Sequence, residues 1–232
     1  MNFIERAKNL LVALGAEWVL WLLVAASILS VAVIVERLLV LRSLRIDGSE
    51  LRALLVEALR SGGTAKAREV LSSFLHPAAQ VALRGLERAE NETNAEQAEG
   101  RMNAEIIVQR RRLEQRFAVL ASLGANAPFI GLFGTVIGIL KAFDALGSTA
   151  AQASAAMAPQ TVMSAIAESL VATAVGLGVA IPAILAFNAF QKVVKASLDD
   201  AQVLALEVIA HLQSPDSVRA RSSRSPSLRQ VS

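Results

Sequence analysis

The sequence predicts an all-α membrane protein with three transmembrane helices, two of which extend into the cytoplasm, and with a helical cytoplasmic loop. Hydrophobic residues make up 54% of the chain and aromatic residues only 4%, which is typical of Ala-, Val- and Leu-rich membrane helices and disfavours a cytosolic enzyme. Three apolar runs are long enough to cross a hydrocarbon core of roughly 30 Å. Apolar residues also recur at helical spacing between these runs.

The first transmembrane helix is predicted at residues 18–41, after an N-terminal segment of residues 1–17. Its apolar run has an aromatic anchor at its start and a Glu-Arg pair at its end: Trp18, Trp21, Glu36 and Arg37. A cleaved signal peptide is the alternative. It is disfavoured because the run begins late, is long and is not followed by a small-residue cleavage site.

The cytoplasmic loop is predicted at residues 42–116 and contains several helices. The apolar face of its first helix consists of Leu51, Leu54, Leu55, Ala58 and Leu59. Gly62 and Gly63 end this helix, and Thr64 can cap the next one. The apolar stripe of that next helix consists of Val70, Leu71, Phe74 and Leu75.

His76 and Pro77 interrupt this stripe, and His76 is interpreted as a loop residue. A metal site would need more ligands, and the only other histidine, His211, lies far along the chain. From Asn103 the helical pattern runs without a breaker through an arginine cluster into the second span.

The second and third transmembrane helices are predicted at residues 117–142 and 162–191, joined by a periplasmic loop of residues 143–161. The third span continues as a cytoplasmic helix over residues 192–213. Residues 214–232 are rich in Ser, Arg and Pro and cannot bury enough apolar surface to fold, which predicts a disordered tail.

The positions of lysine and arginine predict the orientation. Basic residues follow the first and third spans and precede the second: Arg37, Arg42, Arg45, Arg110, Arg111, Arg112, Arg116, Lys192 and Lys195. These ends are therefore cytoplasmic by the positive-inside rule, so the N-terminus is periplasmic and the C-terminus cytoplasmic. The sequence has no aromatic interleaving or motif for a nucleic-acid partner.

Glu168 is the candidate functional residue, because it is the only ionisable residue between Asp144 and Lys192. A carboxylate at bilayer depth costs about 2.5 to 3.5 kcal/mol even on lenient insertion scales. We therefore expect Glu168 to face a polar cavity, a partner helix or an ion path. The alternative is a carboxyl group that neighbouring hydroxyls satisfy inside a static bundle.

Small residues in the last two spans predict close helix packing. Steps of four from Glu168 give residues that are expected to share its side of the helix: Ser164, Ala172, Gly176 and Ala180. The second span has a similar small surface: Gly131, Gly134 and Gly138. Tight packing alone is the alternative role for the glycines, and a nucleotide-binding motif is excluded because no strand precedes them.

Two threonines and a proline complete the set of candidate residues. Thr135 and Thr173 have hydroxyls that can donate and accept protons, although a bond to the threonine's own backbone is the alternative. Pro182 removes a hydrogen bond to the carbonyl of Gly178 and permits a bend.

Two blocks carry a specific resemblance to a known family. APFIGLFGTVIGI, from Ala127 to Ile139, and IAESLVATAVGLGVAIP, from Ile166 to Pro182, resemble the ExbB/TolQ/MotA family of proton-channel subunits. The three spans are closest to the ExbB/TolQ branch. The resemblance implies a proton pathway lined by Thr135, Glu168 and Thr173, and an anchoring role for the Glu36-Arg37 pair.

The resemblance further implies a homo-pentamer in the bacterial inner membrane, surrounding an ExbD/TolR-like single-span partner. Protons would be the coupling ion, with no cofactor and no metal, and a TonB/TolA-like protein would be a possible further partner. The implied function is a stator or motor subunit, not an enzyme, that uses the proton motive force to energise outer-membrane transport, envelope maintenance or gliding.

Two other classes of function stay open. A non-conducting membrane scaffold would use Glu168 to fix helix register. A solute transporter would bind a cationic substrate there, although three spans without an internal repeat or paired broken helices disfavour it. The chain alone does not separate the three kinds of envelope work, or protons from sodium.

Overall fold

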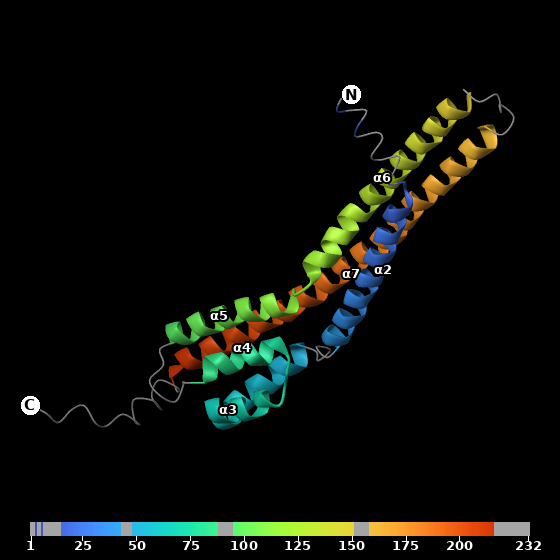
Figure 1. The fold of residues 1–232 in the computed structure, drawn as a ribbon. Coiled ribbons are helices and arrows are strands. Elements are labelled where there is room, and N and C mark those ends of the chain that lie inside the picture. Colours follow the sequence, from blue (N-terminus) through green and yellow to red (C-terminus); the bar gives the residue numbers. More distant parts are fainter. Residues whose placement is uncertain are drawn as a thin grey trace, which may run out of the picture. The chain divides into compact units, whose positions relative to one another are not determined.

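The computed structural model describes residues 15–42, 48–87, 95–150 and 158–215, together with Phe3 and Arg6. The regular elements in these ranges are helices (Figure 1): α2 (Glu17–Arg42), α3 (Gly48–Ser72), α4 (Pro77–Leu86), α5 (Ala95–Leu113), α6 (Phe117–Ala150) and α7 (Ala158–Gln213). The predicted all-α fold is confirmed. Most of the predicted N-terminal segment and of the predicted tail lies outside the described residues.

Three of the helices have the length and apolar composition of membrane spans: Glu17–Arg42, Phe117–Gly147 and Val162–Gln213. Each exceeds the roughly 20 residues that a bilayer core requires. The described residues thus contain three candidate spans, the number that the sequence predicted. α7 also runs without interruption to Gln213, as expected from the apolar pattern beyond the third span.

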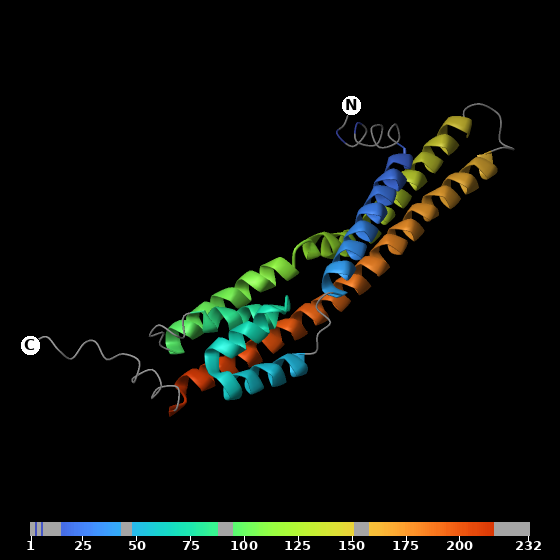
Figure 2. The same cartoon turned by 90° about the horizontal axis from the view of Figure 1, so that it is seen from below.

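The chain forms two compact units, of which the first contains most of the apolar helices. This span unit comprises Met1–Arg37 and Arg116–Ala189, and its parts of α2, α6 and α7 lie side by side (Figures 1 and 2). Edge-to-face ring contacts join Trp18 of α2 to Phe133 of α6, and Phe117 of α6 to Phe187 of α7. Its buried core is Ala16, Val19, Leu23, Ala127, Ile137, Val179 and Ala180.

The second unit, the loop unit, comprises Leu38–Gln115 and Phe190–Ser232. Here α4 packs against both α3 and α5. An ion pair ties α3 to α7, because Arg52 Nε and Nη2 donate to Glu207 Oε1 at 2.9 and 2.5 Å. The largest fully buried side chains of this unit include Leu51, Leu55, Leu71, Leu86, Met102 and Leu204.

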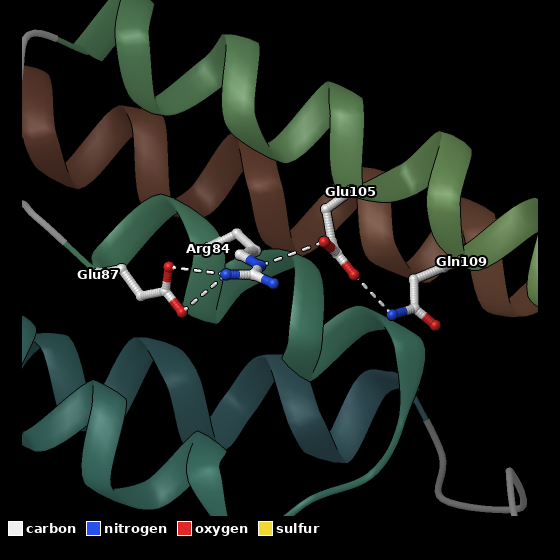
Figure 3. A network of polar contacts seen from close by, with 4 residues as sticks. All are labelled: Arg84, Glu87, Glu105 and Gln109. Atoms are coloured by element: carbon white, nitrogen blue, oxygen red, sulfur yellow. Dashed lines mark hydrogen bonds and ion pairs between the residues drawn. The ribbon is translucent and has the colours of Figure 1, made fainter.

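A polar network on the surface of the loop unit connects α4 to α5 (Figure 3). Arg84 Nη1 donates to both carboxylate oxygens of Glu87 at 3.2 and 3.1 Å, and Arg84 Nε donates to Glu105 Oε2 at 3.2 Å. Gln109 Nε2 donates to the second oxygen of Glu105 at 2.7 Å. One arginine of α4 thereby holds the carboxylate of Glu87, the C-cap of its own helix, and the carboxylate of Glu105 on α5.

The predicted helix end at Gly62 and Gly63 is confirmed, because the backbone leaves helical geometry at Gly63 and divides α3 into two helical segments. Gly63 has φ 66° and ψ −157°, a backbone conformation that glycine adopts readily and other residues rarely do. Two residues of the predicted apolar faces, Leu54 and Leu75, are exposed. Leu75 is 87% exposed because α3 ends at Ser72 and leaves it in the following turn.

The expectation of an unbroken helix from Asn103 into the second span is wrong. α5 ends at Leu113 and α6 begins at Phe117, and Arg116 between them has a left-handed φ of 63°. No glycine or proline marks this break. Arg116 Nη1 instead donates to Glu36 Oε2 of α2, a contact between residues far apart in the sequence.

His76 lies between α3 and α4, as the sequence predicted, but it is buried and has a structural role there. Its exposed fraction is only 2%. It occupies the N-cap of α4, and its side chain accepts a hydrogen bond from the backbone N–H of Ala78. The histidine therefore begins a helix from a buried position.

Candidate functional site

The candidate site lies where small residues bring α6 and α7 into close contact, which we call the α6–α7 seam (residues 127–138 and 169–180). A Cβ atom at Gly131 would lie 2.7 Å from the carbonyl oxygen of Ala172 and 2.9 Å from the Cα of Thr173. A Cβ atom at Gly176 would lie 2.6 Å from the carbonyl oxygen of Ala127. The two backbones are therefore in contact because glycine stands at these positions.

Two further glycines of α6, Gly134 and Gly138, extend this contact. A Cβ atom at Gly134 would meet Ala172 Cβ at 2.9 Å and Val19 Cγ1 of α2 at 3.1 Å, so Gly134 lies where all three helices meet. A Cβ atom at Gly138 would collide with the Cβ atom of Ser169. The small residues of α6 thus face α7 over nearly three helical turns.

Glu168 lies beside the seam and not in it. Its side chain is exposed on this chain, whereas the next residue, Ser169, is only 1% exposed and donates from Oγ to the carbonyl of Ile166 at 2.7 Å. The carboxylate is therefore turned away from α6 and towards the outside of the span unit.

The expectation that the small residues share the side of Glu168 is wrong in part. Ala172, Gly176 and Ala180 are buried, while Ser164 and Glu168 are exposed. The reason is helical geometry, since four residues turn an α-helix by about 400° and each step drifts by about 40°. The buried face of α7 that contacts α6 begins at Ser169 instead.

The two candidate threonines have different surroundings. Thr135 is 7% exposed, and its Oγ1 donates to the carbonyl of Leu132 at 2.6 Å, which is the backbone bond considered as its alternative role. Thr173 Oγ1 is buried in the span unit without a hydrogen-bond partner. The hydrocarbon interior of a membrane offers no hydrogen-bond partner. An unpaired hydroxyl there therefore costs free energy unless a water molecule or another chain forms a hydrogen bond with it.

The single chain does not join the three candidate residues into a path. No hydrogen bond among the described residues links Glu168 to Thr135 or Thr173. Glu168 and Thr173 are five positions apart, which separates them by about 140° around α7. A continuous polar route would therefore need groups from outside this chain or water molecules.

Proline occurs in both helices of the seam. Pro182 stands inside α7, as expected, and Pro128 stands inside α6; the second was not singled out from the sequence. Each proline removes the hydrogen bond to the carbonyl four residues before it, and both of those residues are glycines, Gly124 and Gly178. Both helices nevertheless continue through their prolines.

A charged cluster stands at the end of α2 within the span unit. Glu36 accepts from Arg37 Nη2 at 3.3 Å with one oxygen and from Arg116 Nη1 with the other. Arg37 is only 4% exposed, and its Nε has no hydrogen-bond partner. The sequence indicated an anchoring pair here, but gave no sign that Arg116 joins it.

The chemistry of the site follows from one carboxylate in an apolar setting. Large apolar side chains near Glu168 in the sequence are also exposed: Met163, Ile166, Leu170 and Val171. A carboxyl group on such a surface can exchange a proton or bind a polar group of a neighbouring helix. Within the described ranges no cluster of three His, Asp or Glu residues could hold a metal ion.

Comparison with known proteins gives a family. Residues 74–202, more than half of the chain, match the model of the MotA/TolQ/ExbB proton channel family. The biopolymer transport protein ExbB of Neisseria gonorrhoeae is 44% identical over 102 residues, which is 44% of either chain. The Tol-Pal system protein TolQ of Pseudomonas aeruginosa is 45% identical over 89 residues, or 38% of this chain and 36% of that protein.

A longer match at lower identity extends beyond these segments. The biopolymer transport protein ExbB of Pseudomonas putida is 33% identical over 141 residues, or 60% of this chain and 41% of that protein. The matched part of this chain spans less than half the length of each of these three relatives.

Proposed function

Because this chain belongs to the MotA/TolQ/ExbB proton channel family, we propose that it is a proton-conducting subunit of a bacterial inner-membrane motor. It uses the proton motive force to energise work across the cell envelope. The relatives named above act in biopolymer transport and in the Tol-Pal system. Outer-membrane transport and envelope maintenance are therefore both candidates for that work, and gliding is a third.

The observation that carries this proposal is the position of Glu168. It is a lone acidic residue in the apolar third span, and it is exposed on the outside of the chain. The free-energy cost of a carboxylate facing lipid favours its coverage by another protein surface. We therefore place the proton pathway between this chain and its neighbours, with Glu168 as the group that carries the proton.

The two threonines extend the pathway from Glu168. Thr173 Oγ1 has no hydrogen-bond partner among the described residues and can bind a water molecule. Thr135 Oγ1 already donates to Leu132 but keeps lone pairs that can accept a further hydrogen bond. Water between these hydroxyls and the carboxylate would complete a chain of proton carriers.

The proposed assembly is a homo-pentamer with an ExbD/TolR-like single-span subunit. The exposed apolar faces of the three spans support an arrangement in which further helices cover part of their surface. The N-terminus faces the periplasm and the loop unit the cytoplasm, in agreement with the basic residues at the ends of the spans. A TonB/TolA-like protein is a further candidate partner.

Proton flux in proteoliposomes tests the proposal. The complex is purified with its own partner subunit and reconstituted with a pH-sensitive dye inside the vesicles. Glu168→Gln is expected to abolish the flux while the size of the complex stays unchanged, because glutamine has the shape of glutamate and carries no titratable proton. The matched control is Glu17→Gln, the same chemical change at the first residue of α2, which should conduct normally.

Two results would contradict the proton pathway. Unchanged flux through Glu168→Gln would assign the carboxyl group to packing. A complex that falls apart in Glu168→Gln and is restored in Glu168→Asp without any flux would favour the scaffold, in which the carboxylate fixes helix register.

Native mass spectrometry of the protein from its own membranes tests the assembly separately. A ring of five copies that retains a small single-span subunit with an acidic residue is the expected result. A monomer, or an oligomer without a second kind of chain, would contradict the proposed assembly. The identity of any third protein would name the process that is energised.

A further inference from the structure

His76 joins α3 to α4 and caps α4 with its side chain. Its φ of −66° and ψ of 138° are those of an N-cap residue, and Nδ1 accepts a hydrogen bond from Ala78 N–H at 3.3 Å. Its carbonyl accepts the first helical bond from Gln80 N–H at 3.2 Å. A nitrogen that accepts a hydrogen bond carries no proton, so the cap requires the neutral ring with its proton on Nε2.

The electrostatic partner of His76 belongs to a different helix. Burial lowers the pKa of His76 below its ordinary value, and the carboxylate of Asp200 on α7 opposes this with a smaller rise. The side chain of Asp200 therefore interacts electrostatically with the imidazole from α7.

The carboxylate of Asp200 also contacts the beginning of α3. It lies so close to Gly48, the first residue of α3, that a Cβ atom at this position would collide with it. A negative charge at this end of a helix is favourable, because the first backbone N–H groups point towards it. The starts of α3 and α4 and the C-terminal part of α7 therefore meet around one histidine and one aspartate.

We propose that His76 is a pH-responsive joint of the loop unit, which caps α4 when neutral and releases it to interact with Asp200 of α7 when protonated. Three physical effects act in the same direction. Protonated Nδ1 is a donor and cannot accept from Ala78. The imidazolium charge repels the positive end of the α4 dipole. The carboxylate of Asp200 attracts that same charge.

The consequence is a link between proton concentration and α7. The helix that carries Asp200 is the helix that carries Glu168. With the loop unit on the cytoplasmic side, acidification of the cytoplasm would release the cap of α4 and attract His76 to Asp200 of α7. Protons that reach the cytoplasm would thereby act on the helix that carries Glu168. The joint itself can be tested without proton flux, so its failure and the failure of the proposed channel are separate results.

Nitrogen-15 NMR of the reconstituted complex with labelled histidine measures the protonation of His76. The chain has two histidines, so His211→Asn leaves one labelled imidazole and assigns its two nitrogen signals. We expect the Nε2–H tautomer at pH 7.5 and protonation of His76 at a pH below about 6.5, the ordinary value for histidine. Asp200→Asn should move this transition to lower pH. A transition that stays in place would refute the role of Asp200.

Hydrogen exchange of the first turn of α4 measures the cap. After correction for the intrinsic pH dependence, exchange of the Ala78 amide should accelerate roughly two- to thirty-fold on protonation of His76, the range expected for loss of an N-cap. His76→Asn is the matched variant, because its Oδ1 can accept the same bond and cannot titrate. Its Ala78 exchange should not change across this pH range.

Three outcomes would overturn the proposed joint. The first is an Ala78 amide whose exchange in the wild type does not respond when His76 titrates. The second is a His76→Asn variant that loses protection as the wild type does. The third is a His76 ring that stays neutral down to the pH at which the whole complex unfolds.

Discussion

The seam between α6 and α7 makes a quantitative prediction for two glycines of one helix. Gly176→Ala places a Cβ atom 2.6 Å from the carbonyl oxygen of Ala127 and 3.2 Å from the Cα of Gly131. Both neighbours are backbone atoms, so relief requires the helices to separate. Gly178→Ala meets nothing within 4 Å. The gain in helix propensity, up to about 1 kcal/mol, is common to both changes.

The difference between the two variants therefore isolates the packing cost. Overpacking of a tight interior costs about 1 to 3 kcal/mol, so Gly176→Ala should be less stable than Gly178→Ala by this amount. At about 2 to 4 °C per kcal/mol for a chain of this size, the two Tm values should differ by on the order of 2 to 12 °C.

Thermal unfolding of both variants in the same detergent, followed by circular dichroism, gives the comparison. Gly147→Ala serves as a second control, because a Cβ atom at Gly147 would also meet nothing within 4 Å. Equal Tm values for Gly176→Ala and Gly178→Ala would refute the close approach of α6 and α7. A Gly176→Ala variant that is more stable than Gly178→Ala would refute it as well.

Three further predictions concern ionisable side chains. Arg116→Gly should be more stable than Arg116→Ala by about 1 kcal/mol in chemical denaturation. Both variants lose the contact with Glu36, but only alanine keeps a Cβ atom at a residue with left-handed backbone. Equal stabilities of the two variants would contradict this prediction. Because burial lowers the pKa of His76, the unfolded state binds the proton more readily, so the free energy of unfolding should fall as the pH drops below about 6.5 and should fall less in His76→Asn. Identical pH dependence of the free energy of unfolding in the wild type and in His76→Asn would contradict this prediction. A double-mutant cycle on Arg52 and Glu207 should give a coupling energy of at most about 1 kcal/mol that decreases with salt, and a coupling that salt leaves unchanged would be inconsistent with an exposed pair.

The three spans could be predicted because hydropathy and length are local properties of the sequence. A run of about 20 apolar residues has few folded alternatives to a membrane helix. The isolated position of Glu168 was visible for the same reason. Its side of the helix was harder to predict, since steps of four residues drift around α7 and placed the carboxylate with residues that the structure buries.

The break before α6 could not be predicted from local sequence. Helix ends are recognised by glycine, proline and capping residues, and the segment around Arg116 has none of them. Its left-handed backbone coincides with a contact to Glu36, which lies on a helix far away in the sequence. Tertiary contacts of this kind override local propensity and have no local signature.

The N-cap at His76 was missed for a different reason. Histidine is not among the preferred capping residues, which are Ser, Thr, Asp and Asn, so the His-Pro pair indicated only an interruption. Pro77 at the first helical position is the signal that could have identified it. The contribution of Asp200 lies on another helix and could be found only in the folded chain.

The three span helices bury little of their own surface within this chain. In the most apolar window of each span, only 28%, 33% and 28% of the residues are buried. The remaining positions face whatever surrounds the protein, and lipid demands only that they be apolar, whereas a neighbouring protein also demands a definite shape. Exchanges among Leu, Ile and Val should therefore be silent on lipid-facing sides and harmful on protein-facing sides. The positions along α2, α6 and α7 that tolerate such exchanges would thus identify the lipid-facing surface, and the positions that do not would identify the surface covered by neighbouring proteins.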